Sequence, residues 1–252
     1  MNEETAQVPF HFFRIGLIVT GEGERRFMPA FLRALTDSGR CTFKVLRKIS
    51  QRSPVTSPRK QLKMVGSGKL IPDKDAHDIG FPAREWLNQN DDHLLLLIDD
   101  LEFDRRELKP RIFSRYREAL DRIVPSQLHA RASVHFLVNM IEAYYFAHAA
   151  AVNAVLGTNL SDYQGDVETI RHPKNKLKDY YPGFDEIEHG EAIVKGLDLD
   201  HVLDNPNTCA SLRAMFAWCH LSMGIPRGSR FQLAGGIADH LMGAQAFRLL
   251  SG

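Results

Sequence analysis

Along the first two thirds of the chain, short continuous runs of apolar residues alternate with segments of helical spacing. Residues 14–19 (RIGLIV) and 93–98 (HLLLLI) are continuous runs of a length typical of buried strands. Residues 43–49 predict another strand, and residues 132–138 predict one from their alternation of apolar and polar positions. The run at 93–98 is apolar at every position after its first, so it predicts a central strand covered on both faces.

Apolar residues three and four positions apart mark helices between these strands. Met28, Phe31, Leu32 and Leu35 share one face of a predicted helix that ends near Gly39. Further helices are predicted over residues 81–89, 110–124, 141–156, 191–197, 209–221 and 237–250, and around Lys176. Strands that alternate with helices form parallel sheets through right-handed crossovers. We therefore expect an α/β fold, a Rossmann-like three-layer domain with a mostly parallel central sheet and extra C-terminal helices.

Neither an internal repeat nor a linker divides the sequence, so a single domain is expected over residues 1–252. Residues 38–80 are predicted to contain a basic insertion, because residues 51–72 are rich in Ser, Pro, Gly, Lys and Arg. Residues 157–252 predict a helical C-terminal extension that packs on the sheet. In open α/β sheets, ligands bind at the carboxyl ends of the strands, and a site is expected there.

The composition is typical of a globular protein: 252 residues, of which 44% are hydrophobic and 25% charged. The net charge of +1 excludes a uniformly basic coat for nucleic acid. Three cysteines, Cys41, Cys209 and Cys219, without a C-x-x-C pair predict core thiols in a reducing compartment. Every apolar run is shorter than the ~18 residues of a spanning helix, and the MNEETAQ start is unlike a signal peptide. We expect a cytoplasmic protein that does not contact the membrane.

Acidic residues follow three of the predicted strands. They are Glu22 and Glu24 after the first strand, Asp99, Asp100, Glu102 and Asp104 after the run at 93–98, and Glu142 after residues 132–138. Converging carboxylates raise each other's pKa unless a cation lies between them. Mg²⁺ and Mn²⁺ bind oxygen ligands, and such ions stabilise the attacking and leaving oxygens of phosphodiester cleavage. Acidic residues are also favoured in the first turns of helices, so a purely structural role is the alternative.

The largest charge asymmetry lies between Ser38 and Pro72, a stretch without any acidic residue. Its nine cations are Arg40, Lys44, Arg47, Lys48, Arg52, Arg59, Lys60, Lys63 and Lys69. Such a stretch is typical of contact with a phosphate backbone. The predicted nucleic-acid-binding residues are Arg47, Lys48, Arg52, Arg59, Lys60, Lys63 and Lys69. A solvated loop, or one docked on an acidic partner, is the alternative, and a second basic stretch at 171–178 is interpreted as solvated surface.

Four short motifs carry a resemblance to a known family. They are V-T-G-E-G-E at 19–24, L-L-L-L-I-D-D at 94–100, N-M-I-E-A-Y-Y-F-A at 139–147 and H-P-K-N-K-L-K at 172–178. The first two motifs resemble the Toprim domain of topoisomerases, primases and overcoming-lysogenization-defect nucleases. In both the chain and that domain, a strand is followed by an acidic Gly turn and a helix, and later by an apolar strand that ends in paired acids. All four in order resemble a narrower Toprim-like bacterial family, whose members are linked to AAA-type ATPase partners and to phage defence.

The resemblance implies phosphodiester chemistry that depends on Mg²⁺ or Mn²⁺. The residues it singles out are Glu22 or Glu24 as general acid/base, Asp99, Asp100 and Glu102 as metal ligands, and Glu142 as metal support. Asp100 and Glu102 form a D-x-E version of the acidic pair, and Glu142 matches an E-A-aromatic signature. The chain departs from the usual V-E-G-x-x-E pattern at Thr20, where the family has Glu, so one expected catalytic acid is missing.

Three functions follow as hypotheses. The first is a Toprim-like metal-dependent nuclease that acts on DNA or RNA, with an AAA-type ATPase as partner in phage defence. The second is a non-catalytic subunit with a degenerate site that binds nucleic acid or the ATPase. The third is a small-molecule phosphotransferase or phosphatase, for which the long basic stretch has no evident use.

Overall fold

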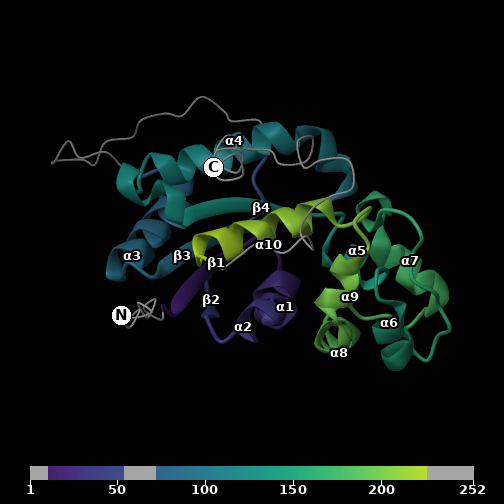
Figure 1. The fold of residues 1–252 in the computed structure, drawn as a ribbon. Coiled ribbons are helices and arrows are strands. Elements are labelled where there is room, and N and C mark those ends of the chain that lie inside the picture. The colour runs from purple at the N-terminus through teal and green to yellow at the C-terminus, as the bar shows by residue number, and fades with distance from the viewer. Residues whose placement is uncertain (1–10, 54–71, 226–252) are drawn as a thin grey trace, which may run out of the picture.

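The computed structural model describes residues 11–53 and 72–225. Within these residues a central sheet of four strands has the order β2-β1-β3-β4, and each neighbouring pair is parallel. The strands are β1 (Phe13–Val19), β2 (Cys41–Lys48), β3 (His93–Leu101) and β4 (Ala132–Val138). Helices cover both faces of the sheet (Figure 1). The predicted α/β fold with three layers is therefore confirmed.

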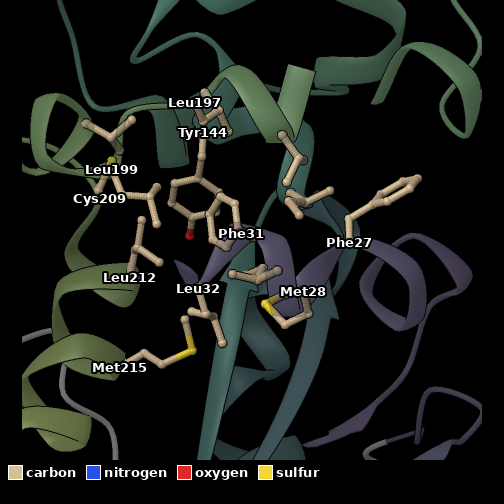
Figure 2. Packing of buried hydrophobic residues seen from close by; sticks show 14 of the residues in the cluster. Phe27, Met28, Phe31, Leu32, Tyr144, Leu197, Leu199, Cys209, Leu212 and Met215 are labelled. Atoms are coloured by element: carbon tan, nitrogen blue, oxygen red, sulfur yellow. The ribbon is translucent and has the colours of Figure 1, made fainter. Parts of the chain in front are cut away.

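One face of the sheet packs against α1 (Glu22–Phe31), α2 (Arg33–Thr36) and α10 (Ala210–Ser222). Phe27, Met28 and Phe31 form the apolar side of α1, Leu32 follows directly after it, and Figure 2 shows all four beside Tyr144 and the α10 residues. Helices α3 (Phe81–Gln89) and α4 (Lys109–Asp121) cover the opposite face. The C-terminal α10 contacts β4 and contributes to the core beneath α1, so this part of the helical C-terminal segment packs on the sheet.

The two central strands send alternate side chains into the two cores. Leu94, Leu96 and Ile98 of β3 join the core beneath α1, whereas Leu95 and Leu97 join the core beneath α4. All five are buried, which confirms that the run at 93–98 is a central strand covered on both faces.

The order of the strands creates a topological switch point between β1 and β3. From β1 the chain moves outward to β2 and then returns to β3 on the other side of β1. Connections that leave in opposite directions open a crevice at the carboxyl ends of the two strands, where ligands bind in open α/β sheets. Beside this edge lie α5 (Ile141–Tyr145), α6 (Ala149–Leu156), α7 (Pro173–Tyr180), α8 (Glu188–Gly196) and α9 (Leu199–Asp204).

Several predicted boundaries differ from the structure, and two of the differences change the architecture. The single helix expected over residues 141–156 is broken into α5 and α6, because the Phe146 carbonyl accepts a hydrogen bond from Tyr163 N–H (2.8 Å) and Ala149 N–H donates to the Asp162 carboxylate (2.7 Å). The basic insertion cannot begin at residue 38, because Cys41–Lys48 is strand β2. The helix predicted over residues 237–250 lies outside the described residues.

The three cysteines are buried free thiols, as predicted. Among the described residues, every helix is too short or too polar to cross a bilayer.

Candidate functional site

The end of β3 places two adjacent carboxylates on opposite faces of the sheet. Side chains alternate along a strand, so Asp99 lies on the side of Leu97 and Asp100 lies on the side of Ile98. Asp99 therefore faces α4, and Asp100 faces α1. The two acids predicted as joint metal ligands are separated by the strand that carries them.

Asp99 is fully buried, and both of its carboxylate oxygens are hydrogen-bonded. Oδ1 accepts from the Thr20 hydroxyl (3.0 Å), Oδ2 accepts from the Tyr116 hydroxyl (3.0 Å), and Arg105 donates to both (3.2 and 3.3 Å). Burial raises the pKa of Asp99, and the Arg105 guanidinium opposes that shift. Asp99 joins β3 to β1 and α4, and its prediction as a metal ligand is corrected to a structural role.

Asp100 shares a cavity with Glu24 of α1 and Glu142 of α5. The cavity has a volume of about 70 Å³ and is also lined by Gly21 and Lys174. A water molecule takes up ~30 Å³ of liquid, so the space suits an ion with a few waters. Three of the acidic residues predicted to converge do lie together, at the switch point between β1 and β3.

Each of these three carboxylates has a buried oxygen that lacks a hydrogen-bond partner within residues 11–53 and 72–225: Glu24 Oε2, Asp100 Oδ1 and Glu142 Oε2. More than 90% of buried polar groups in proteins are paired, and exceptions are typical of catalytic sites or of a place for a water or an ion. Three such oxygens around one cavity make this the principal candidate site of the described chain.

The electrostatics of the cluster favour a cation. Burial raises the pKa of all three carboxyls, that of Glu142 to about 7 and that of Asp100 well above its usual range. The charges of Glu24 and Glu142 raise the pKa of Asp100 further, whereas the Lys174 ammonium lowers it. Carboxyls that repel one another in a buried cavity bind either protons or a positive ion.

Glu24 reaches the cavity because residue 21 has no side chain. A Cβ on Gly21 would lie 1.8 Å from Glu24 Oε2, so any other residue would displace the carboxylate. Glu24 lies in the first turn of α1, where the backbone N–H groups of Gly21 and Glu24 favour its ionised form against burial. The absence of a side chain at Gly21 thus allows the Glu24 carboxylate to fold back over the end of β1.

Glu142 is held by a strained backbone. Asn139 and Met140 immediately before α5 have φ values of 60° and 76°, and Met140 has ψ of 163°, a region occupied almost exclusively by Gly. Such conformations cost about 1–3 kcal/mol each and cluster at functional sites. The strained turn directs the chain from β4 into α5, which brings Glu142 to the cavity.

Sequence reasoning missed three residues of the site. Lys174 lies 3.8 Å from Glu142 Oε1 and forms an ion pair with Glu186, and both line the cavity. The hydroxyl of Tyr145 is buried without a partner in the described chain, and burial together with the charges of Glu142 and Glu24 raises its pKa. Lys174 lies in the basic stretch at 171–178, which is interpreted from the sequence as solvated surface. The H-P-K-N-K-L-K motif is the part of the sequence that indicates a functional role for it.

Glu22 lines the outer edge of the cavity, but it differs from Glu24 in charge environment. Arg25, Lys48 and Arg26 contact its carboxylate and lower its pKa to about 2. A carboxylate that is fully ionised and engaged by three cations is a poor proton acceptor. Of the two predicted catalytic acids, Glu24 alone has the environment of one.

Glu102 lies apart from the three buried carboxylates. It is exposed and, with Asp104, lines a neighbouring cavity of about 230 Å³. The D-x-E pair with Asp100 therefore does not share one cavity, although Lys174 lines both and connects them.

The predicted nucleic-acid-binding residues divide into three groups. Arg52 is buried against Asp75 (2.8 Å) and Asp78 (2.6 Å), so its prediction as a phosphate contact is corrected to a structural ion pair. Arg47 and Lys48 are partly exposed and pair with Asp78 (3.3 Å) and Glu22 (3.1 Å), respectively. Arg59, Lys60, Lys63 and Lys69 lie outside the described residues.

The residues present fit a hard divalent ion. Across the described residues, no group of three or more His, Cys, Asp and Glu side chains has the arrangement of a preformed metal site. Mg²⁺ does not require one, since it keeps several waters and is held by one or two carboxylates plus substrate phosphates. The donors are all oxygens, which suits Mg²⁺ or Mn²⁺ better than softer metals. Glu24, Asp100 and Glu142 are the side chains that would hold the ion.

No protein-family model, no curated protein and no solved structure matches the chain.

Proposed function

We propose that the chain is a Mg²⁺- or Mn²⁺-dependent hydrolase of nucleic-acid phosphodiesters, a nuclease related to Toprim-like proteins. The observation that carries the proposal is the set of three buried, unpartnered carboxylate oxygens of Glu24, Asp100 and Glu142 around one cavity at the switch point of a parallel sheet. The order of the four motifs supports the choice of substrate. It also supports an AAA-type ATPase partner in phage defence.

A bound divalent ion would supply charge neutralisation at the phosphate and an activated water. A carboxylate has two oxygens, so Glu24 would hold the ion through one of them and accept a proton from that water through the other; burial raises its pKa, which suits it to take the proton. The Lys174 ammonium is suited to hold a phosphate oxygen, because it lies at the edge of the same cavity. Asp99 and Thr20 would act indirectly, by fixing the backbone that carries Asp100.

A second candidate is a non-catalytic subunit that binds nucleic acid or an ATPase, and one observation favours it. Thr20 occupies the position of the first acid of the family pattern, and its hydroxyl donates a hydrogen bond to Asp99 and accepts one from the Asp100 N–H. A site that lacks one acid can retain an ion without cleaving a bond.

Cleavage assays separate the two. The purified chain is incubated with supercoiled plasmid, single-stranded DNA and single-stranded RNA in MgCl₂, MnCl₂ or EDTA, with and without an ATPase that copurifies with it. We expect nicking or cleavage that EDTA abolishes and that Asp100→Asn and Glu24→Gln reduce at least 100-fold.

Glu191→Gln is the matched control, because Glu191 is exposed and pairs with Lys195 on α8. Binding of Mn²⁺ without cleavage of any of these substrates would favour the non-catalytic subunit. Turnover of mononucleotides without affinity for polynucleotides would favour a small-molecule phosphatase.

A further inference from the structure

A second cavity adjoins the carboxylate site and contains none of its three buried carboxylates. Its volume is about 230 Å³, and Lys174 lines both cavities. The lining of the second cavity also includes Glu102, Phe103, Asp104, Asn139 and Asn175. Sites for whole drug-sized ligands occupy about 300–1,000 Å³, so this space suits one part of a longer ligand.

Asn139 gives the cavity an unused hydrogen-bond acceptor. Its amide nitrogen donates to the Glu168 carbonyl at 2.7 Å, which fixes the amide orientation and leaves Oδ1 as the remaining polar atom. That oxygen is buried and has no partner in residues 11–53 or 72–225, and Asn139 itself is 1% exposed. The residue has a φ of 60°, so the strained turn that delivers Glu142 to one cavity also delivers Asn139 to the other.

The lining has two chemically different parts. Lys174 and Asn175, in the first turn of α7, offer donors beside the carboxylate site. Asn139, Glu102 and Asp104 offer acceptors, and Phe103 adds an aromatic ring on which the Arg171 guanidinium packs, 4.2 Å from the ring centroid. An anion is favoured at the first part, and a group with hydroxyl or amino donors is favoured at the second.

We propose that this cavity binds one nucleotide unit of a single strand, the unit next to the phosphate that lies at the carboxylate site. Its phosphate contacts Lys174, and a donor of its sugar or base contacts Asn139 Oδ1. This inference rests on the proposed function, because it names the part of the substrate that the site takes.

Fluorescence polarisation tests the inference with single-stranded DNA and RNA hexamers that carry phosphorothioate linkages, in MgCl₂. Asn139→Gly removes the acceptor and suits the positive φ, and Asn175→Glu places an anion on an exposed lining position. We expect each to weaken hexamer binding at least 10-fold, while the affinity for Mn²⁺ measured by calorimetry stays within 2-fold of wild type. A stronger effect of Asn139→Gly on RNA than on DNA would assign the Oδ1 partner to the ribose hydroxyl, and an equal effect would assign it to the base.

Lys178→Gln is the matched control, because it changes the net charge by the same amount at an exposed position of the same helix, on a residue that does not line this cavity. Unchanged hexamer affinity of Asn175→Glu, with Mn²⁺ bound, overturns the inference even if Asn139→Gly does not fold. Equal loss in Lys178→Gln overturns it as well, because the effect would then be one of net charge. Failure of the wild type to bind Mn²⁺ instead overturns the proposed function.

Discussion

The Thr20 hydroxyl lies 3.0 Å from Asp99 Oδ1 and also accepts a hydrogen bond of 3.0 Å from the backbone N–H of Asp100. This one side chain therefore connects the carboxyl ends of β1 and β3 and fixes the two aspartates on opposite faces of the sheet. Thr20, which departs from the Toprim-like pattern, stabilises the strand ends that carry the site, and it does not line the cavity.

Thr20→Val is expected to destabilise the fold by about 1–3 kcal/mol, because it leaves Asp99 Oδ1 and the Asp100 N–H without this partner in the interior. Urea unfolding followed by circular dichroism measures the loss. Thr20→Ser keeps the hydroxyl and should recover most of it. Equal stability of Thr20→Val and wild type would contradict the structural role.

Asp99→Asn and Asp100→Asn are expected to have opposite effects. Asp99→Asn weakens the buried ion pair with Arg105 and should cost about 1–3 kcal/mol while Mn²⁺ binding persists. Asp100→Asn removes a repulsive buried charge, so it should leave stability equal or higher while Mn²⁺ binding is lost. Calorimetry and urea unfolding of both variants provide the two readouts. Loss of metal binding in both variants at equal stability would mean that the two aspartates act together.

The contribution of Glu142 to the stability of the metal-free protein should fall as the pH rises from about 4.5 to 7. The pKa of Glu142 is about 7 in the folded chain and 4.5 without burial, so the folded state holds the proton over this interval. The stability that protonated Glu142 contributes is complete below pH 4.5 and is lost as the pH rises through about 7. Glu142→Gln should stabilise the protein at pH 8 by on the order of 3 kcal/mol.

Thermal unfolding in EDTA at pH 5 and pH 8 measures this effect. The difference between the two pH values should shrink in Glu142→Gln and remain in Glu191→Gln, whose carboxylate is exposed. A stability that rises with pH in wild type, and in the same way in Glu142→Gln, would show that Glu142 is not held protonated.

Gly21→Ala is expected to abolish Mn²⁺ binding with little change in the fold. The added methyl group would occupy the position of Glu24 Oε2, so the carboxylate must leave the cavity. Gly23→Ala is the control, because the nearest atom to a Cβ there belongs to Phe27 at 3.9 Å, an ordinary contact. Mn²⁺ binding by Gly21→Ala with wild-type affinity would show that Glu24 is dispensable.

Most of the sheet could be predicted from the sequence because β1, β3 and β4 are largely buried. The continuous run at 93–98 and the alternation at 132–138 each gave an unambiguous strand, and the helix over Phe81–Gln89 was predicted with its exact bounds. The break between α5 and α6 could not be predicted, since it depends on hydrogen bonds from residues 162 and 163, which lie in a separate loop.

The site could be predicted only in part. The positions of Glu24, Asp100 and Glu142 follow from where strands end in a parallel sheet, so their convergence was within reach of the sequence. The separation of Asp99 from Asp100 follows from the two-residue period of β3, which continues through both aspartates because the strand ends at Leu101 and not at Ile98. Lys174 and Arg52 could not be assigned, because pairing with carboxylates far along the chain is a property of the tertiary structure.

The central claim is that Glu24, Asp100 and Glu142 form a site for one hard divalent ion. Titration calorimetry with MnCl₂ at pH 7.5, in two buffers of different ionisation enthalpy, tests it most directly. We expect saturable binding with release of protons, because the ion replaces those held by carboxyls of raised pKa. We also expect a loss of affinity of at least 10-fold in Asp100→Asn and in Glu142→Gln. Absence of binding in wild type, or binding with wild-type affinity in both variants, would contradict it.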